Sequence, residues 1–150
     1  LSMSMISQEN NALSIVSLIG LFIWVAGFVI EVVSDSQKRN FRKDLNNKGR
    51  FISTGLWSRS RHPNYFGEIT LWVGISVISL SSLSGIGYVA LISPFFVYAL
   101  LSKGSGIPLL ERSADKKWGN ESDYQEYKKG TPVLFPKLFN NIKQSNDNGN

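Results

Sequence analysis

Three apolar runs constrain the fold more than any other feature of this 150-residue sequence. Residues 13–33 form a 21-residue stretch whose only charged side chain is Glu31, and runs of about 17 residues follow at 66–82 and 86–102. A helix needs about 20 apolar residues to cross a bilayer core, and about 17 is the short end of the range. Because only Leu83-Ser84-Gly85 separates the second and third runs, we expect a tight helical hairpin there. The sequence therefore predicts an all-α integral membrane bundle of about three transmembrane helices, with cytosolic amphipathic or re-entrant helices.

The basic residues favour one topology for these spans. All 16 Lys and Arg lie within residues 38–61 or 103–143, eight in each segment. The positive-inside rule then places both segments in the cytosol, and residues 1–12, a non-cytosolic tail, on the far side with the turn near 83–87. We expect a multi-pass protein of the endoplasmic reticulum if eukaryotic, or of the inner membrane if bacterial. The polar, Asn-rich residues 138–150 are expected to be a disordered tail.

The composition also excludes several kinds of site. The sequence has no cysteine and one histidine, so thiolate chemistry is absent and no metal site is expected. The net charge of +5 fits loops that face anionic lipid or an anionic cofactor. Nucleic-acid binding is not expected, because the basic residues flank apolar spans and do not form a soluble basic face.

The single histidine lies in a polar and aromatic segment just before the second apolar run. Pro63 favours the first turn of a helix, whose free N–H groups and dipole attract phosphate. Arg61 and His62 precede that turn, and Trp57 and Tyr65 are flat rings that can stack on a ligand. This chemistry suits a nucleotide-like cofactor. The alternative is a solvated basic loop in which the two aromatic residues anchor the membrane interface.

Two other cytosolic segments carry candidate ligand groups. Glu31, Asp35, Lys38 and Arg42 share one face if the first helix continues past the membrane, either to bind a polar ligand or as surface ion pairs. Gly104, Gly106 and Pro108 interrupt the third run, and a helix is expected from Pro108 to about Trp118. The segment 124–136 is either part of the site or an amphipathic interfacial segment.

Four motifs occur in a fixed order along the sequence. They are Glu31-x-x-x-Asp35-x-Gln37-Lys38-x-x-Phe41-Arg42, Gly55-Leu56-Trp57-x-x-x-Arg61-His62-Pro63-Asn64-Tyr65-Phe66-Gly67-Glu68, Ser105-Gly106-Ile107-Pro108-Leu109-Leu110-Glu111 and Tyr124-x-x-Tyr127-x-x-x-Thr131-Pro132-x-x-x-Pro136. Together these motifs resemble the C-terminal half of the steroid 5-alpha-reductase-like membrane enzymes. The similarity covers about residues 24–137 and implies a membrane domain over 13–137. The same half is more distantly similar to sterol C14 and C7 reductases.

The resemblance implies an NADPH-dependent reductase that reduces a C=C bond in a steroid-like or other lipid substrate. It implies a cytosol-facing NADPH pocket in which Lys38 and Arg42 lie near the phosphates, and we expect a phosphate contact from Arg61 as well. It further implies that Trp57, His62, Asn64 and Tyr65 line the nicotinamide or ribose region and that Glu111 and Tyr127 close the pocket.

The reaction also needs a proton donor. Tyr65 and Tyr127 are the expected donors, because a tyrosine in a dry pocket stays neutral and can still donate. His62 is expected to orient the cofactor or a carboxylate, Glu68 or Glu111.

Two alternatives to the reductase remain. Isoprenylcysteine and phospholipid methyltransferases, which bind S-adenosylmethionine, share an Arg-His-Pro-x-Tyr string, although Asn64 and the Ile-Pro-Leu-Leu-Glu string ending at Glu111 favour the reductases. A non-catalytic membrane module is the third possibility. In the steroid reductases, the groups that polarise the substrate ketone come largely from the preceding half, which this sequence is not expected to contain.

Overall fold

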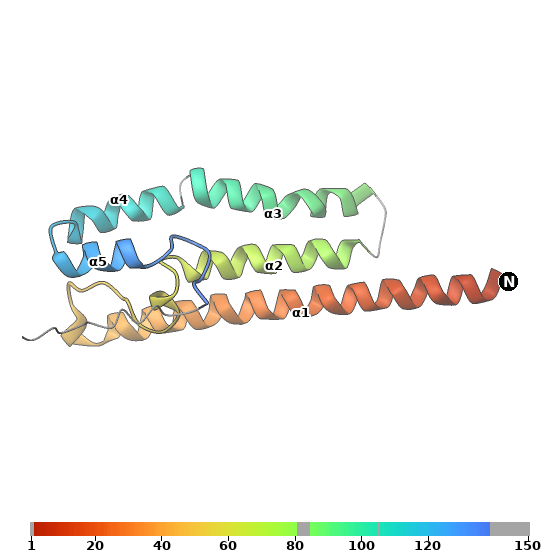
Figure 1. The fold of residues 1–150 in the computed structure, drawn as a ribbon, viewed down its shortest axis with the longest axis horizontal. Coiled ribbons are helices and arrows are strands. Elements are labelled where there is room, and N and C mark those ends of the chain that lie inside the picture. Colours follow the sequence, from red (N-terminus) through yellow and green to blue (C-terminus); the bar gives the residue numbers. More distant parts are fainter. Residues whose placement is uncertain (1, 81–84, 105, 139–150) are drawn as a thin grey trace, which may run out of the picture.

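The described residues form helices joined by short loops. The computed structural model describes residues 2–80, 85–104 and 106–138, with side chains over 15–80, 88–104 and 106–138. Within these ranges the elements are α1 (Ser2–Lys43), α2 (Pro63–Ser79), α3 (Gly85–Lys103), α4 (Ile107–Trp118) and α5 (Ser122–Gly130), with 3-10 turns at Leu45–Asn47 and Gly55–Ser58 (Figure 1). No strand occurs among them, which confirms the all-α class. Residues 83 and 84 of the expected hairpin turn lie outside the described residues, and so do residues 139–150 of the expected tail.

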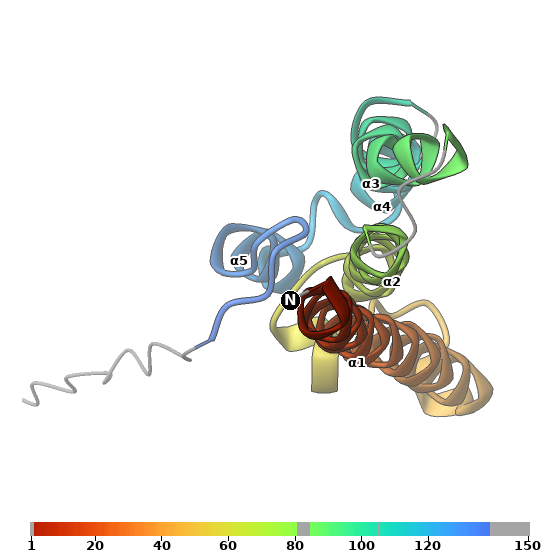
Figure 2. The same cartoon turned by 90° about the vertical axis from the view of Figure 1, so that its right-hand side faces the viewer.

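The three long helices run side by side. α2 lies between α1 and α3, α4 continues beyond α3, and α5 returns along α4 (Figures 1 and 2). Among the described residues, two stretches are long and apolar enough to cross a membrane, Ile15–Lys43 and Tyr88–Trp118, and only 11% and 6% of their apolar windows are buried. The apolar part of the second stretch is α3, because α4 carries five charged side chains. Such exposed apolar helices suit a lipid environment.

The helix ends follow local chemistry. Pro63 and Pro108 occupy the first turns of α2 and α4, where a missing N–H group costs no helical hydrogen bond. α1 begins at Ser2, so residues 2–12 are helical. It ends at Lys43, ten residues beyond the apolar run, and this extension carries Lys38 and Arg42. α2 has 17 residues, so it is shorter than the two candidate spans.

A glycine seam joins α1 to α2. Gly20 and Gly27 of α1 face Gly74 and Gly67 of α2, and the two glycines on each helix are seven residues apart. A Cβ on Gly67 would lie 2.6 Å from the Glu31 backbone nitrogen, and one on Gly74 would lie 2.5 Å from that of Trp24. The two backbones therefore touch where a side chain has no room. The repeat of seven residues keeps the same faces together along two nearly antiparallel helices.

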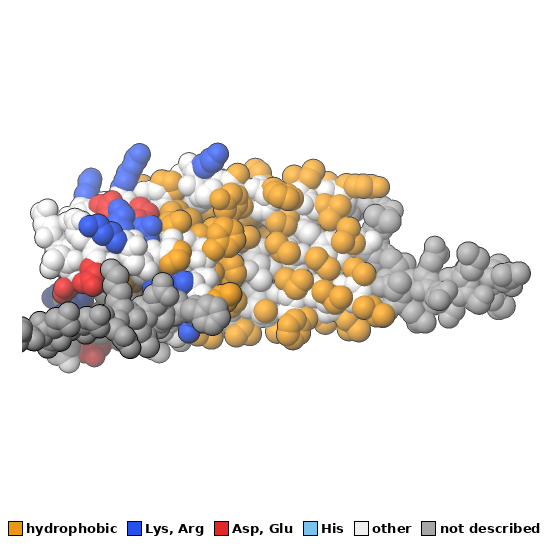
Figure 3. Space-filling model, in the orientation of Figure 1, with side chains coloured by type: hydrophobic (Ala, Val, Ile, Leu, Met, Phe, Trp, Pro, Cys, Tyr) orange, Lys and Arg blue, Asp and Glu red, His pale blue; other side chains and the backbone are white. Residues whose placement is uncertain are grey.

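Charge and apolar side chains separate along the molecule. In Figure 3 the blue and red side chains gather at the end that holds α4 and α5, and orange side chains cover the middle. The basic segments that begin at residues 38 and 103 thus lie at the same end. This is the arrangement expected if both segments face one side of a membrane.

Candidate functional site

A pocket opens at the charged end of the molecule. Its volume is about 160 Å³, and α1, α4, α5 and the segment from Arg50 to His62 contribute its walls. We call it the cationic pocket, because five Lys and Arg side chains line it and Glu111 is its only lining carboxylate. The five are Lys38, Arg42, Arg50, Arg61 and Lys117.

The one carboxylate is already neutralised. Glu111 Oε2 lies 2.5 Å from Arg61 Nη1 and 3.8 Å from Lys128 Nζ, and Oε1 lies 2.7 Å from His62 Nε2. The four other basic side chains of the pocket form no ion pair with a described residue. The cationic pocket therefore has an excess of about four positive charges, which would favour a ligand with several negative charges.

Arg61, His62 and Glu111 form a connected group of side chains in the wall. His62 is buried, and its backbone N–H donates to the Ser60 hydroxyl. Of the two carboxylates expected beside this histidine, Glu111 is its partner. Burial raises the pKa of Glu111, but the hydrogen bond with His62 and the charge of Arg61 outweigh burial, so the pKa is lowered overall. Glu111 is thus an anion that fixes the Arg61 and His62 side chains.

Trp57 is held from three sides. Its indole Nε1 donates to the Ser34 carbonyl of α1 at 3.0 Å, and its own carbonyl accepts from the Tyr127 hydroxyl at 2.5 Å. Lys38 Nζ lies 4.8 Å from the centre of the indole ring, so the ring positions this ammonium by a cation–π contact. Burial raises the pKa of Tyr127, and its phenol therefore stays protonated.

Aromatic rings form the wall opposite α1. Phe51 lies with its ring centre 5.9 Å from that of Trp118 and 5.4 Å from those of Tyr124 and Tyr127. Trp118 Nε1 also donates to the Gly49 carbonyl at 2.8 Å. These contacts fasten the loop after α1 to α4 and α5, and they place flat apolar surface beside the cations.

Residues 131–138, here called the strap, fasten the C-terminal side of the pocket. The Arg61 N–H donates to the Pro132 carbonyl, Arg61 Nε to the Thr131 carbonyl and the Ser60 hydroxyl to the Leu134 carbonyl. The strap therefore sets the position of Arg61 through hydrogen bonds to its backbone and its side chain. In Figure 1 the strap is the blue segment that leaves α5 and passes the N-terminal end of α2.

Most of the site residues expected from the sequence meet in the cationic pocket. Seven of the nine line it: Lys38, Arg42, Trp57, Arg61, His62, Glu111 and Tyr127. Asn64 and Tyr65 do not. The Asn64 side-chain oxygen is buried without a hydrogen-bond partner among the described residues, and the Tyr65 ring stacks on His62 with centroids 5.7 Å apart. The first turn of α2 thus lies beside the pocket and not in its wall.

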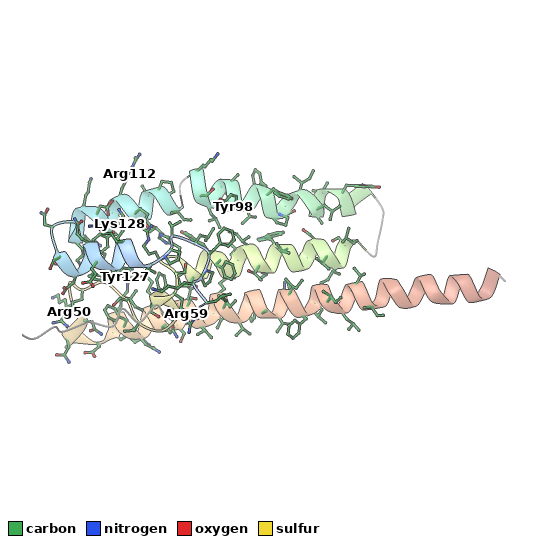
Figure 4. All side chains as sticks on the ribbon, viewed as in Figure 1. Arg50, Arg59, Tyr98, Arg112, Tyr127 and Lys128 are labelled. Carbon is green, nitrogen blue, oxygen red and sulfur yellow. The ribbon has the colours of Figure 1, made fainter. Side chains whose placement is uncertain are left out.

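Sequence reasoning missed several lining residues. Arg50, Phe51, Lys117 and Tyr124 reach the pocket, and Figure 4 shows Arg50 at the same end as Tyr127 and Lys128. A helical wheel of α4 carries a usable signal, because Glu111 and Trp118, seven residues apart, fall on one face, and Ala114 and Lys117, three residues apart, fall on the adjoining face. No such pattern marks Arg50 and Phe51, which lie in an irregular loop.

A second cavity, the apolar groove, lies between α2 and α3. Its volume is about 490 Å³, and its lining is almost entirely apolar, including Ile69, Val73 and Pro94. Tyr98 is the lining residue with a hydroxyl in no hydrogen bond to a described residue, and Figure 4 places it on α3. Ser76, the other polar lining residue, donates to the Ala90 carbonyl at 2.6 Å. Phe135 of the strap lines the same groove.

Comparison with known proteins shows the family of the chain. Residues 1–131 match the family described as protein of unknown function (DUF1295). The chain is 31% identical over 122 residues to 3-oxo-5-alpha-steroid 4-dehydrogenase 1 of Macaca fascicularis, covering 81% of the chain and 41% of the relative. It is 30% identical over 124 residues to steroid 5-alpha-reductase DET2 of Arabidopsis thaliana, covering 81% and 42%.

One relative carries a different activity in its name. The probable O-methyltransferase ustE of Ustilaginoidea virens is 33% identical over 98 residues, covering 65% of the chain and 32% of the relative. No solved structure matches the chain. The chain spans about two fifths of the length of the steroid reductases it matches. It belongs to the DUF1295 family and is a distant relative of the steroid 5-alpha-reductases.

Proposed function

We propose that this chain forms the NADPH-binding part of a membrane reductase that acts on a C=C bond of a lipid. The observation that carries the proposal is the cationic pocket, in which four basic side chains lack a carboxylate partner among the described residues. The distant kinship with steroid 5-alpha-reductases supports the reaction class. The membrane domain over residues 13–137 and its multi-pass location are part of the proposal.

The charge of the pocket distinguishes between two cofactors. NADPH carries a pyrophosphate and a further phosphate, and Lys and Arg bind such groups through charge-assisted hydrogen bonds. S-adenosylmethionine carries a sulfonium and an ammonium against one carboxylate, so a surplus of cations repels it. A volume of about 160 Å³ is below the range of roughly 300–1,000 Å³ typical of small-molecule sites. The pocket therefore suits the phosphate-bearing part of a dinucleotide, with the remainder outside it.

The pocket residues divide into contacts and supports. Lys38, Arg42 and Arg61 would bind phosphate oxygens, and Trp57 would hold Lys38 in place. Glu111 would keep Arg61 and His62 in fixed orientations. When bound, NADPH supplies the hydride, and the protein orients the reacting groups and excludes water.

The proton donor is proposed to be Tyr65 in preference to Tyr127. The Tyr127 hydroxyl donates a hydrogen bond to the Trp57 carbonyl at 2.5 Å, so it supports the wall. The Tyr65 hydroxyl makes no hydrogen bond with a described residue, and its ring packs against His62. Loss of turnover with unchanged NADPH affinity in Tyr65→Phe would support this assignment. The same result in Tyr127→Phe alone would reverse it.

The substrate is proposed to be an apolar lipid of sterol-like size. The apolar groove offers about 490 Å³ and a single available hydroxyl, that of Tyr98, to bind one polar group of such a molecule. Substrate identity can be tested by turnover with a steroid enone compared with an acyl chain of similar length. A protein that reduces neither, while binding NADPH, would leave the cofactor proposal standing and refute this substrate class.

The decisive experiment is a pair of binding titrations in detergent, one with NADPH and one with S-adenosylmethionine. Lys38→Ala and Arg42→Ala should each weaken NADPH roughly ten- to hundredfold, because one charge-assisted hydrogen bond contributes about 1.5–3 kcal/mol. Lys43→Ala is the matched control, since Lys43 is an exposed basic residue next to Arg42 on α1 that does not line the pocket.

Each outcome has a clear meaning. Tight NADPH binding that depends on Lys38 and Arg42 but not on Lys43 supports the reductase. Preferential binding of S-adenosylmethionine would favour the methyltransferase function named for the fungal relative. Binding of neither would contradict both and leave the non-catalytic membrane module.

A further inference from the structure

The strap exposes large apolar side chains beside the cationic end of the protein. Phe135 is 63% exposed and Leu138 is 81% exposed, and Val133 is also exposed. A short irregular segment that presents three apolar side chains within six residues is costly in water. A less polar neighbour would remove this cost.

The strap lies level with the start of the apolar surface. The ring centre of Phe135 is 6.1 Å from that of Phe66 in the first turns of α2, in an edge-to-face contact. Phe135 also lines the apolar groove with Val73 of α2 and Tyr98 of α3. The strap therefore connects the charged end to the apolar middle of the molecule, at the boundary that Figure 3 shows between blue and orange side chains.

Two cations accompany these apolar side chains. Arg59 Nη1 donates to the carbonyls of Lys137 and Leu138, both at 3.1 Å, and Figure 4 shows Arg59 over α1 near this boundary. Lys137 Nζ donates to the Gly130 carbonyl at 2.9 Å. Neither cation forms an ion pair with a described residue. Both side chains are thus held by backbone carbonyls while their charge remains uncompensated.

We infer that the strap is a membrane-interface anchor for a leaflet containing anionic phospholipid. Phe135 and Leu138 enter the boundary between headgroups and acyl chains, and Arg59 and Lys137 bind lipid phosphates. Apolar side chains and basic side chains together give interfacial binding that neither supplies alone. Because the strap also bonds to Arg61, the bilayer surface supports the wall of the cationic pocket. This inference does not depend on the identity of the cofactor.

The absence of cysteine makes a direct test possible. Leu138→Cys carries a single nitroxide label in the full chain, reconstituted in nanodiscs that contain phosphatidylglycerol. Val89→Cys, exposed on α3, is the lipid control, and Glu126→Cys, exposed on α5, is the aqueous control. Accessibility to oxygen, which concentrates in lipid, is compared with accessibility to a water-soluble nickel chelate.

We expect the accessibilities of the label at position 138 to lie between those of the two controls, and its accessibility to oxygen to exceed its accessibility to nickel. A label as accessible to nickel as that at 126 would place the strap in water and overturn the inference. Low accessibility to both reagents would show that protein covers the strap, and this would overturn it equally.

A second arm tests the role of charge. Replacing phosphatidylglycerol with phosphatidylcholine should move the label toward water. The double variant Arg59→Gln, Lys137→Gln should show the same label accessibility in both lipids. The reason is that each basic residue near an anionic surface raises the affinity of a segment for that surface roughly fivefold. Lys129→Gln, which replaces an exposed lysine on α5, is the control and should retain the dependence on the anionic lipid. Equal lipid dependence in the double variant would reject the phosphate contacts.

Discussion

The glycine seam offers the sharpest test of the architecture, through Gly67→Ala. The new Cβ would lie 2.6 Å from the Glu31 nitrogen and 2.8 Å from the Gly27 carbonyl oxygen, whereas ordinary contact begins at 3.4 Å. The helices would have to separate by about 0.8 Å at this point to restore ordinary contact. Both opposing atoms belong to the backbone, so no side-chain rotation can relieve the clash.

The magnitude follows from two opposing effects. Alanine favours a helix over glycine by about 1 kcal/mol, whereas overpacking costs about 1–3 kcal/mol. Because backbone atoms lie opposite the new Cβ, the upper end of the overpacking cost applies. The free energy of unfolding should then fall by about 2 kcal/mol. For a chain of this size that corresponds to a fall in Tm of about 4–8 °C. Since α1 carries Lys38 and α2 follows Arg61, splaying the seam should also weaken ligand binding in the cationic pocket.

Thermal unfolding in detergent, followed by tryptophan fluorescence, measures this effect. Trp24, one of the four tryptophans that contribute to the signal, lies in the seam opposite Gly74. Gly130→Ala is the control, because no heavy atom lies within 4 Å of its Cβ position and its φ is not positive. It should leave Tm unchanged or slightly higher. A Gly67→Ala protein with a Tm equal to or above that of the wild type would refute the close backbone contact.

Two further substitutions address the pocket. Glu111→Gln removes the charge that Arg61 and His62 share and should cost about 1.5–3 kcal/mol of stability, measured by thermal unfolding at neutral pH. Because the pKa of Glu111 is below its ordinary 4.5, its contribution is complete above that pH and is lost as the pH falls through the lowered value. The stability difference between wild type and Glu111→Gln should therefore shrink on acidification, and a difference that stays constant would contradict the assignment. Tyr127→Phe removes the hydrogen bond to the Trp57 carbonyl and should cost about 1 kcal/mol, and an unchanged Tm would show that this bond adds nothing.

The helices could be predicted because their signals are local. The apolar runs at 66–82 and 86–102 lie within three residues of α2 and α3, and Pro63 marks the observed start of α2. The helix expected from Pro108 to Trp118 differs from α4 by one residue. The extension of α1 to Ser2 was not evident, because polar residues hide helix propensity from a search for apolar spans. Its extension to Lys43 meets the condition under which Glu31, Asp35, Lys38 and Arg42 share one face.

The pocket was only partly predictable, for a physical reason. Lys38, Arg61 and Glu111 belong to motifs and could be assigned from the sequence. Arg50 and Phe51 reach the pocket through tertiary contacts of their loop, among them the hydrogen bond from Trp118 to the Gly49 carbonyl, which joins residues 69 positions apart. The strap contacts are similarly distant and use backbone carbonyls, which leave no side-chain pattern to read.

The contacts of the strap also order events in time. During synthesis the N–H and guanidinium donors of Arg61 emerge about 70 residues before the carbonyls of Thr131 and Pro132 that they bind. Until then these donors stay hydrated. The wall of the cationic pocket is therefore completed after α1, α2 and α3 have formed. A nascent chain halted before residue 131 would contain the helical frame and lack a finished binding site.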